Sequence, residues 1–107
     1  MTRTARIVVP GLPHHLTQRG NRSMDVFDED GDRLAYLSIL DKYARRYGLE
    51  IWAYCLMTNH IHMVAVPQTE FSMAHTLRET NTRYASWFNH RYDTSGHLWH
   101  GRYYSCV

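Results

Sequence analysis

Two histidines separated by one apolar residue, His60 and His62 around Ile61, have the spacing that most directly suggests chemistry. The chain contains 8 histidines among 107 residues, a composition that directs attention to metal or proton chemistry. On a β-strand, the period of two places both imidazoles on one face and Ile61 on the other, with the histidine Cβ atoms about 7 Å apart. Two imidazoles at that spacing can lean toward one divalent cation.

A His-x-His pair has other readings when it is taken alone. It is more often a pair of hydrogen-bonded surface or partly buried histidines than a metal site. A closed structural zinc site needs four ligands, and neither Cys55 nor Cys106 lies near the pair in the sequence. Other histidines could complete a site only if folding brings them close: His14, His15, His97 and His100.

The turn signals divide the chain into six elements that must position this pair. The expected elements are a strand at 14–19, a helix at 30–47, strands at 49–57 and 60–66, a helix that begins at 72 and ends around 92–96, and a strand at 99–107. This β-α-β-β-α-β order predicts a ferredoxin-like split βαβ fold of the α+β class. Both helices should cover one face of an antiparallel four-stranded sheet, and the other face should be open.

The helical segments show apolar residues at intervals of three and four, which predicts the faces that pack on the sheet. In the first segment these are Leu34, Leu37, Leu40, Tyr43, Ala44 and Tyr47, followed by Gly48 as a helix stop. In the second they are Met73, Ala74, Leu77, Tyr84, Trp87 and Phe88. If Ile61 faces these helices, the two histidines face outward on the open side.

The composition indicates the general class of protein but not its function. A chain of 107 residues with 44% hydrophobic residues fits a single domain spanning 1–107. The formal charge of +2 is too small to argue for a polyanionic partner, although basic residues cluster locally at 3–6, 19–22, 42–46 and near 102. We expect Cys55 and Cys106 to be reduced core thiols, and the absence of a long apolar run predicts a soluble, cytoplasmic protein without a membrane segment.

Segment 54–63 has the sequence YCLMTNHIHM, which contains His60 and His62. It resembles the metal-binding signature of the REP-associated tyrosine transposases and their insertion-sequence relatives, the single-tyrosine transposases with a His-hydrophobic-His motif. Segments 10–22 and 96–104 resemble the parts of the family that begin and end this region. The resemblance spans nearly the whole chain and implies the same ferredoxin-like plan that periodicity indicates.

The resemblance implies a DNA strand transferase. Such an enzyme cuts and rejoins hairpin-forming single-stranded DNA through a 5′-phosphotyrosine intermediate, with a divalent metal, Mg or Mn, held here by His60 and His62. The family carries its nucleophilic tyrosine on a helix after the last strand, so the attacking residue is expected beyond Val107. The chain is therefore expected to be a C-terminally truncated and inactive form. Tyr84 is the in-chain fallback nucleophile, although its helical spacing favours a core position.

Contacts to DNA are expected from two groups of residues. Arg19, Asn21 and Arg22 follow the first strand and could donate to phosphates, with a solvated turn as the alternative. Trp99 and Arg102 could provide a stacking plane and a charged donor, with a core position as the alternative for Trp99. His14 and His15 point to opposite faces, so at most one shares the metal face. Tyr54 is expected to pack or to stack on DNA, and Tyr103 and Tyr104 should alternate between the two faces.

Two other functions remain open from the sequence. One is a non-catalytic module that binds single-stranded nucleic acid on the open sheet face. The other is a small metal-binding structural domain. Single-stranded or hairpin DNA is the expected partner, and a homodimer is an open alternative to a monomer.

Overall fold

A computed structural model describes residues 7–107, so the basic cluster expected at 3–6 lies outside the described residues. The elements are β1 (His14–Arg19), the short 3-10 helix η1 (Asn21–Ser23), α1 (Asp30–Tyr47), β2 (Leu49–Leu56), β3 (His60–Pro67), α2 (Ser72–Arg91) and β4 (Tyr104–Cys106). Their order is the one that the sequence predicts.

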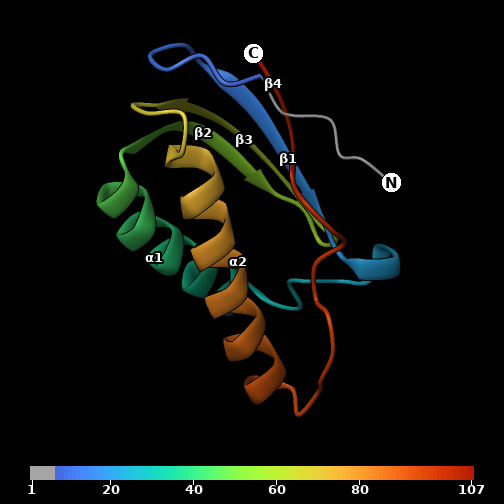
Figure 1. The fold of residues 1–107 in the computed structure, drawn as a ribbon. Coiled ribbons are helices and arrows are strands. Elements are labelled where there is room, and N and C mark those ends of the chain that lie inside the picture. Colours follow the sequence, from blue (N-terminus) through green and yellow to red (C-terminus); the bar gives the residue numbers. More distant parts are fainter. Residues whose placement is uncertain (1–6) are drawn as a thin grey trace.

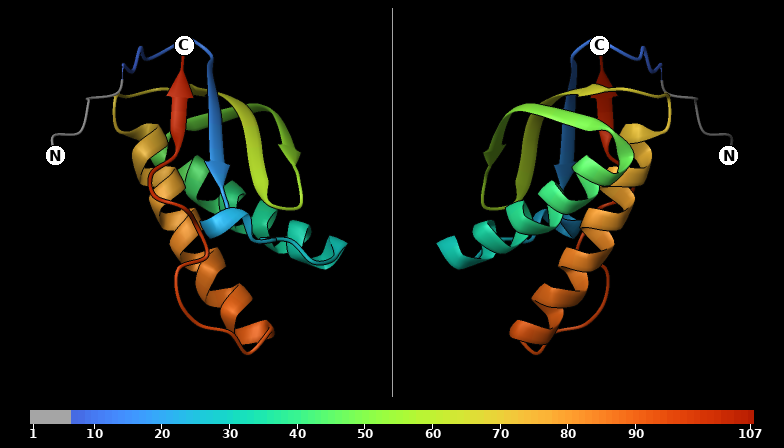
Figure 2. Two further views of the ribbon diagram at one scale, coloured as in Figure 1. Left: turned by 90° about the vertical axis from the view of Figure 1, so that its right-hand side faces the viewer. Right: turned by 90° about the vertical axis from the view of Figure 1, so that its left-hand side faces the viewer.

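The four strands form one antiparallel sheet in the order β2-β3-β1-β4. Both helices, α1 and α2, lie on the same side of this sheet, and within residues 7–107 neither of them covers the other side (Figure 1; Figure 2). This arrangement confirms the predicted ferredoxin-like α+β fold. The strands β3 and β1 occupy the centre, so residues on them are the best fixed by hydrogen bonds to neighbours on both sides.

The last strand is shorter than the sequence predicts. Of the expected 99–107, only Tyr104–Cys106 pairs with β1, and Trp99 makes an isolated bridge to Gly20. Between them, Gly101 has a φ of 59°, in the left-handed region that interrupts a strand. The segment before β4 is therefore a loop that touches the end of β1 and then rejoins the sheet.

The first helix packs through a stripe that matches the predicted one in part: Leu40, Tyr43 and Ala44 are buried as expected. Its buried residues are Asp32, Tyr36, Leu40, Tyr43 and Ala44. Leu34 was expected in this stripe, but its side chain is 67% exposed, because it lies nearly opposite Tyr36 on the helix. A capping box between Glu29 and Asp32 starts the helix, and Gly48 ends it in the left-handed conformation, as predicted.

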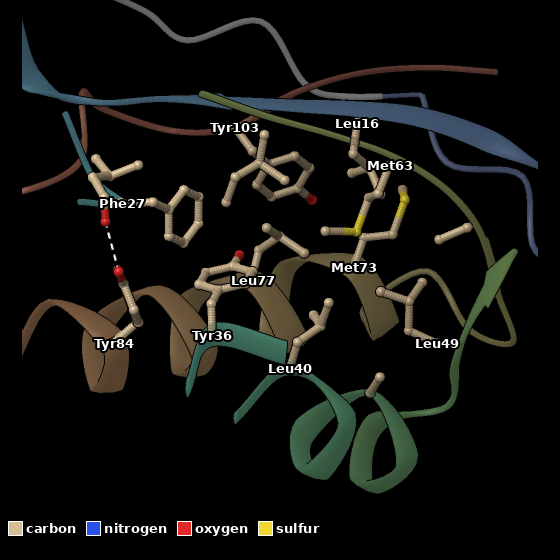
Figure 3. Packing of buried hydrophobic residues seen from close by; sticks show 14 of the residues in the cluster. Leu16, Phe27, Tyr36, Leu40, Leu49, Met63, Met73, Leu77, Tyr84 and Tyr103 are labelled. Carbon is tan, nitrogen blue, oxygen red and sulfur yellow. Dashed lines mark hydrogen bonds between the residues drawn. The ribbon is translucent and has the colours of Figure 1, made fainter. Parts of the chain in front are cut away.

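The core fills the space between the sheet and the two helices (Figure 3). Tyr84 on α2 is fully buried there, and its hydroxyl donates a hydrogen bond of 2.6 Å to the carbonyl of Val26. The aromatic rings of Phe27, Tyr36 and Tyr84 contact one another edge-on or tilted. The core thus depends on aromatic residues whose polar ends find partners.

A buried carboxylate links the start of α1 to the end of α2. Asp32 is fully buried and accepts a 2.6 Å hydrogen bond from the Tyr92 hydroxyl. It also accepts bonds from the backbone N–H groups of Asp28 and Glu29, and Arg91 lies 3.4 Å from its other oxygen. Burial by itself raises the pKa of Asp32, but these donors and the Arg91 charge outweigh it and hold the pKa below its ordinary value.

Within residues 7–107, no helix combines the length and the apolar character needed to cross a bilayer.

Candidate metal and nucleic-acid site

The two motif histidines lie side by side on the open face of the sheet. Their ring centroids are 4.9 Å apart and the ring planes are nearly perpendicular, at 86°. Ile61 between them is 1% exposed and points toward the helices. The alternation along β3 therefore places both imidazoles together on the uncovered side, as the period of two predicts.

A third histidine joins them from the neighbouring strand. Nε2 of His15 on β1 lies 3.1 Å from Nδ1 of His62, and the two rings are nearly parallel, with centroids 5.2 Å apart. The hydroxyl of Thr17 lies 3.4 Å from the same nitrogen. Because side chains alternate along a strand, only one of His14 and His15 can point to this face. The pairing of β1 with β3 identifies it as His15.

His14 occupies the opposite face, where it is fully buried. Its Nδ1 lies 2.7 Å from the carbonyl oxygen of Leu12, and its Nε2 accepts a bond of 3.1 Å from the backbone N–H of Val9. Both ring nitrogens thus have backbone partners, which is the way a buried imidazole is stabilised. His14 holds the segment before β1 and takes no part in the outer cluster.

The electrostatic surroundings favour a neutral imidazole at His62. Partial burial lowers its pKa, and the nearby His60, His15 and Arg19 lower it further, because each of them disfavours another positive charge. A neutral imidazole has one nitrogen lone pair free to bind a metal ion. His60 is anchored separately, through a 2.7 Å contact between its Nδ1 and Oδ1 of Asn59.

The donor set fits an open coordination site better than a closed one. Among the described residues 7–107, no group of three or more His, Cys, Asp or Glu side chains is arranged as a metal-binding cluster. A cation bound at His60 and His62 would be held by two imidazoles on the open face, and its remaining positions would be filled by water or phosphate oxygens. A four-ligand structural zinc site has no equivalent in this arrangement.

The two cysteines lie on the open face and not in the core, where they were predicted. Cys55 pairs with His62 across β2 and β3, and Cys106 pairs with His15 across β4 and β1. Both thiols are free and exposed. They were predicted to be core thiols, and this is wrong because the flanking strands turn these positions toward the side that no helix covers. Neither thiol is in a disulfide bond, which agrees with the expectation of reduced thiols.

The predicted DNA-contact residues fall into two places. Arg19 is exposed on the open face and pairs with His60 across β1 and β3. Arg22 is exposed in η1 with a φ of 53°, and the side chain of Asn21 donates to the carbonyl of His97. These three residues therefore line the end of the sheet where His60 begins β3, with Asn21 serving to hold the 97–99 loop.

Trp99 and Arg102 lie beside the helices, not on the open face with His60 and His62. Trp99 is partly buried, contacts the ring of Tyr36 and donates through Nε1 to the carbonyl of Asn81 at 3.0 Å. Arg102 is exposed and, with Arg78, borders a cavity of about 510 Å³ between α2 and the loop before β4. Trp99 is thus largely a packing residue, which was the alternative to a DNA contact. Arg102 lies with Arg78 at a second place on the surface, separate from Arg19 and Arg22.

The tyrosines divide clearly between core and surface. Tyr84 is fully buried, and burial, followed by the nearby Asp32, raises its pKa, so its hydroxyl is neither accessible nor easily ionised. Tyr103 is buried, whereas Tyr104 is 66% exposed on the open face, opposite Thr17. Tyr54 is 53% exposed on the edge strand β2. Sequence reasoning did not single out Tyr104 for the site, because its face depends on the register of a three-residue strand.

Fold and site together define an α+β protein that presents a His-hydrophobic-His pair on the uncovered face of a ferredoxin-like sheet. Residues 8–107 match the family model described as IS200-like transposase. The chain therefore belongs to the IS200-like transposase family. Among curated proteins, none matches the sequence.

Two solved structures are similar in fold. One is a REP-associated tyrosine transposase bound to a REP hairpin, with a TM-score of 0.75, 18% identity and coverage of 99% of this chain and 61% of that chain. The other is a candidate transposase from Deinococcus radiodurans R1, with a TM-score of 0.72, 23% identity and coverage of 99% of this chain and 85% of that chain. This chain thus spans less than two thirds of the length of the first relative.

Proposed function

We propose that this chain provides the metal-binding and DNA-binding scaffold of a single-tyrosine transposase that cuts and rejoins hairpin-forming single-stranded DNA. The observation that carries the proposal is the pair His60 and His62, 4.9 Å apart between ring centroids, on the open face of a family-matched fold. Both side chains are only partly buried, so a phosphate can approach them.

In this proposal His60 and His62 hold a divalent cation, Mg or Mn, which when bound polarises the scissile phosphate and eases departure of the leaving oxygen. Imidazole nitrogen suits Mn²⁺ more readily than Mg²⁺, which prefers oxygen ligands. The lowered pKa of His62 keeps a lone pair available near neutral pH. Arg19, opposite His60, supplies a positive charge on the side from which a DNA phosphate would approach.

Hairpin DNA is the proposed substrate because the similar REP-associated transposase was solved with a REP hairpin. On this chain the open face combines a basic residue, Arg19, with an exposed aromatic ring, Tyr104. Cationic and aromatic side chains together suit a single strand, since the cation attracts phosphates and the ring can stack on a base. Arg22 at the end of the sheet adds a second exposed cation near the same edge.

The chemical step needs a tyrosine oxygen that attacks phosphorus while the bond to the 3′ oxygen breaks, giving a 5′-phosphotyrosine and a free 3′-hydroxyl. Tyr84 does not suit this step, because its hydroxyl is buried and bonded to Val26. The tyrosine expected after Val107 stays a prediction. Reading the gene past the codon for Val107 tests it directly.

A metal titration tests the cation site. Manganese binding to the wild-type chain is measured by the loss of the free-ion electron paramagnetic resonance signal, and His60→Ala and His62→Ala are compared with His90→Ala, an exposed histidine at the end of α2. We expect each motif substitution to remove most of the binding and the control to retain it. Equal binding by the double variant and the wild type would refute the metal assignment.

A DNA titration tests the substrate. Fluorescence anisotropy compares a hairpin carrying single-stranded flanks with a mixed-sequence duplex at low and moderate salt. Arg19→Ala should weaken binding and reduce the salt slope by about 1, whereas Arg46→Ala on α1 should not. Binding of hairpin without metal dependence would favour the alternative of a non-catalytic nucleic-acid module, for which the exposed Tyr104 ring is the supporting observation.

A further inference from the structure

The two motif histidines share a feature that the motif itself does not specify: in both rings Nδ1 has a partner. Nδ1 of His60 lies 2.7 Å from Oδ1 of Asn59, and Nδ1 of His62 lies 3.1 Å from Nε2 of His15. Neither Nε2 has a hydrogen-bond partner among the described residues. Each ring is thus held at one nitrogen and left available at the other.

The contact at His60 fixes the direction of its proton. A carboxamide oxygen accepts hydrogen bonds and cannot donate them, so Nδ1 of His60 must carry the hydrogen. The orientation of the amide is set by its other end, since Nδ2 of Asn59 donates to the carbonyl of Ser23 at 3.4 Å. In the neutral ring, Nε2 of His60 then carries a lone pair.

The contact at His62 allows the same pattern, since either nitrogen of this pair can be the donor. A nitrogen-to-nitrogen distance of 3.1 Å between two neutral imidazoles needs one shared hydrogen. If Nδ1 of His62 donates it to Nε2 of His15, the free nitrogen of His62 is also an unprotonated Nε2. His15 is exposed, so its own Nδ1 can keep its hydrogen in contact with water.

We propose that His15 and Asn59 are positioning residues that hold His62 and His60 in the Nδ1-protonated tautomer, so that both rings present Nε2 to the cation. Metal-binding histidines generally donate their second ring N–H to an acceptor that fixes tautomer and ring orientation. The part of this inference that concerns the cation rests on the proposed function. The tautomers themselves are a property of the metal-free chain.

Nitrogen NMR of the metal-free chain tests the tautomers without any cation. The spectra are recorded at about pH 8, where the two nitrogens of a neutral imidazole have distinct shifts. We expect Nδ1 of both His60 and His62 to be the protonated nitrogen. Substituting His15→Ala should release only His62 to a mixture of tautomers, and Asn59→Ala should release only His60. A proton on Nε2 of His62 in the wild type would overturn the assignment.

Manganese affinity then tests the link to the cation. We expect His15→Ala and Asn59→Ala each to weaken binding by about 10 to 100 fold, the usual effect of removing such an acceptor. His15→Gln keeps a side-chain oxygen as acceptor and should recover most of the loss, while His90→Ala should bind as the wild type does. Loss as complete as that of His62→Ala, without recovery by glutamine, would make His15 a ligand and overturn the positioning assignment.

The two experiments separate the failures of the two ideas. The expected tautomers together with no manganese binding in the wild type would refute the proposed cation site and leave the tautomer assignment standing. Manganese binding that is insensitive to His15→Ala and Asn59→Ala would keep the cation site and overturn the positioning residues. Thermal unfolding of each variant, expected to match the wild type, checks that the fold is intact.

Discussion

The two faces of β3 have different roles: residues on one face pack in the core, and residues on the other form the candidate site. Ile61, Met63 and Ala65 face the helices and are at most 2% exposed, whereas His60 and His62 on the other side remain partly exposed. In the described part of the chain, residues on the helix side are packed between the sheet and the helices, whereas residues on the open side have neighbours mainly from adjacent strands. Substitutions one residue apart should therefore affect different properties of the protein.

Polar groups also differ between the faces. On the helix side, buried polar side chains form a connected set, in which Tyr36 donates to Asn81 and Asn81 donates to Gln18. On the open side, the histidines have one nitrogen bonded and one free. A buried polar group without a partner is costly, so ring nitrogens that are to bind a ligand are kept unsatisfied at lower cost on the open face than in the core.

The sharpest test of this division compares Ile61→Ala with His62→Ala. Removing the buried Ile61 side chain should lower the free energy of unfolding by about 2 to 5 kcal/mol, because it leaves a cavity beneath the sheet. His62→Ala should change it little and should instead abolish manganese binding. Chemical denaturation measures the first effect and metal titration the second. Equal destabilisation by both would contradict the division.

The buried carboxylate should give the next largest effect. Asp32→Asn weakens the bonds from Tyr92 and two backbone amides, and we expect a loss of about 1.5 to 3 kcal/mol at neutral pH. Because the folded protein lowers the pKa of Asp32, its contribution is complete above the ordinary value of 3.8 and disappears as the pH falls through the lowered value. The variant should show a shallower loss of stability in acid. Asp41→Asn, at an exposed pair with Arg45, is the control and should behave as the wild type.

A smaller effect should separate two tyrosines. Tyr84→Phe leaves the Val26 carbonyl without its donor and should cost roughly 1 kcal/mol, because that carbonyl is enclosed by the core. Tyr104→Phe on the open face should stay within about 0.5 kcal/mol of the wild type. A third variant, Tyr104→Ala, bears on function: it removes the ring and should weaken hairpin binding, whereas Tyr84→Phe and Tyr104→Phe should not. A stability loss at Tyr104 equal to that at Tyr84 would mean that the open face is packed.

Much of the fold follows from local patterns in the sequence. The alternation around Ile61 identified the strand and the shared face of His60 and His62, since side-chain direction on a strand has a strict period. Gly48 marked the end of α1 for a similarly local reason. The buried face of α1 does not follow from the sequence in full, because Leu34 and Tyr36 are both able to pack and the position of the sheet decides between them.

The candidate site was only partly predictable because it is assembled across strands. His15 is 47 residues from His62, and their contact depends on the register of β1 against β3, which no local pattern specifies. The exposure of Cys55 likewise depends on its place on an edge strand. Apolar neighbours in sequence suggested a buried thiol, but on a strand these neighbours point to the other face.

Labelling of the two cysteines tests the exposure of the open face and should have the smallest effect on stability. Both thiols should react with a small aromatic disulfide reagent while the protein is folded, and Cys55→Ser and Cys106→Ser should each remove one reactive group. Labelling should change the free energy of unfolding by less than about 0.5 kcal/mol, as for other surface changes. Since Cys55 pairs with His62 across the strands, its label should hinder manganese binding more than the label at Cys106. Thiols that react only after unfolding would mean that this face is covered.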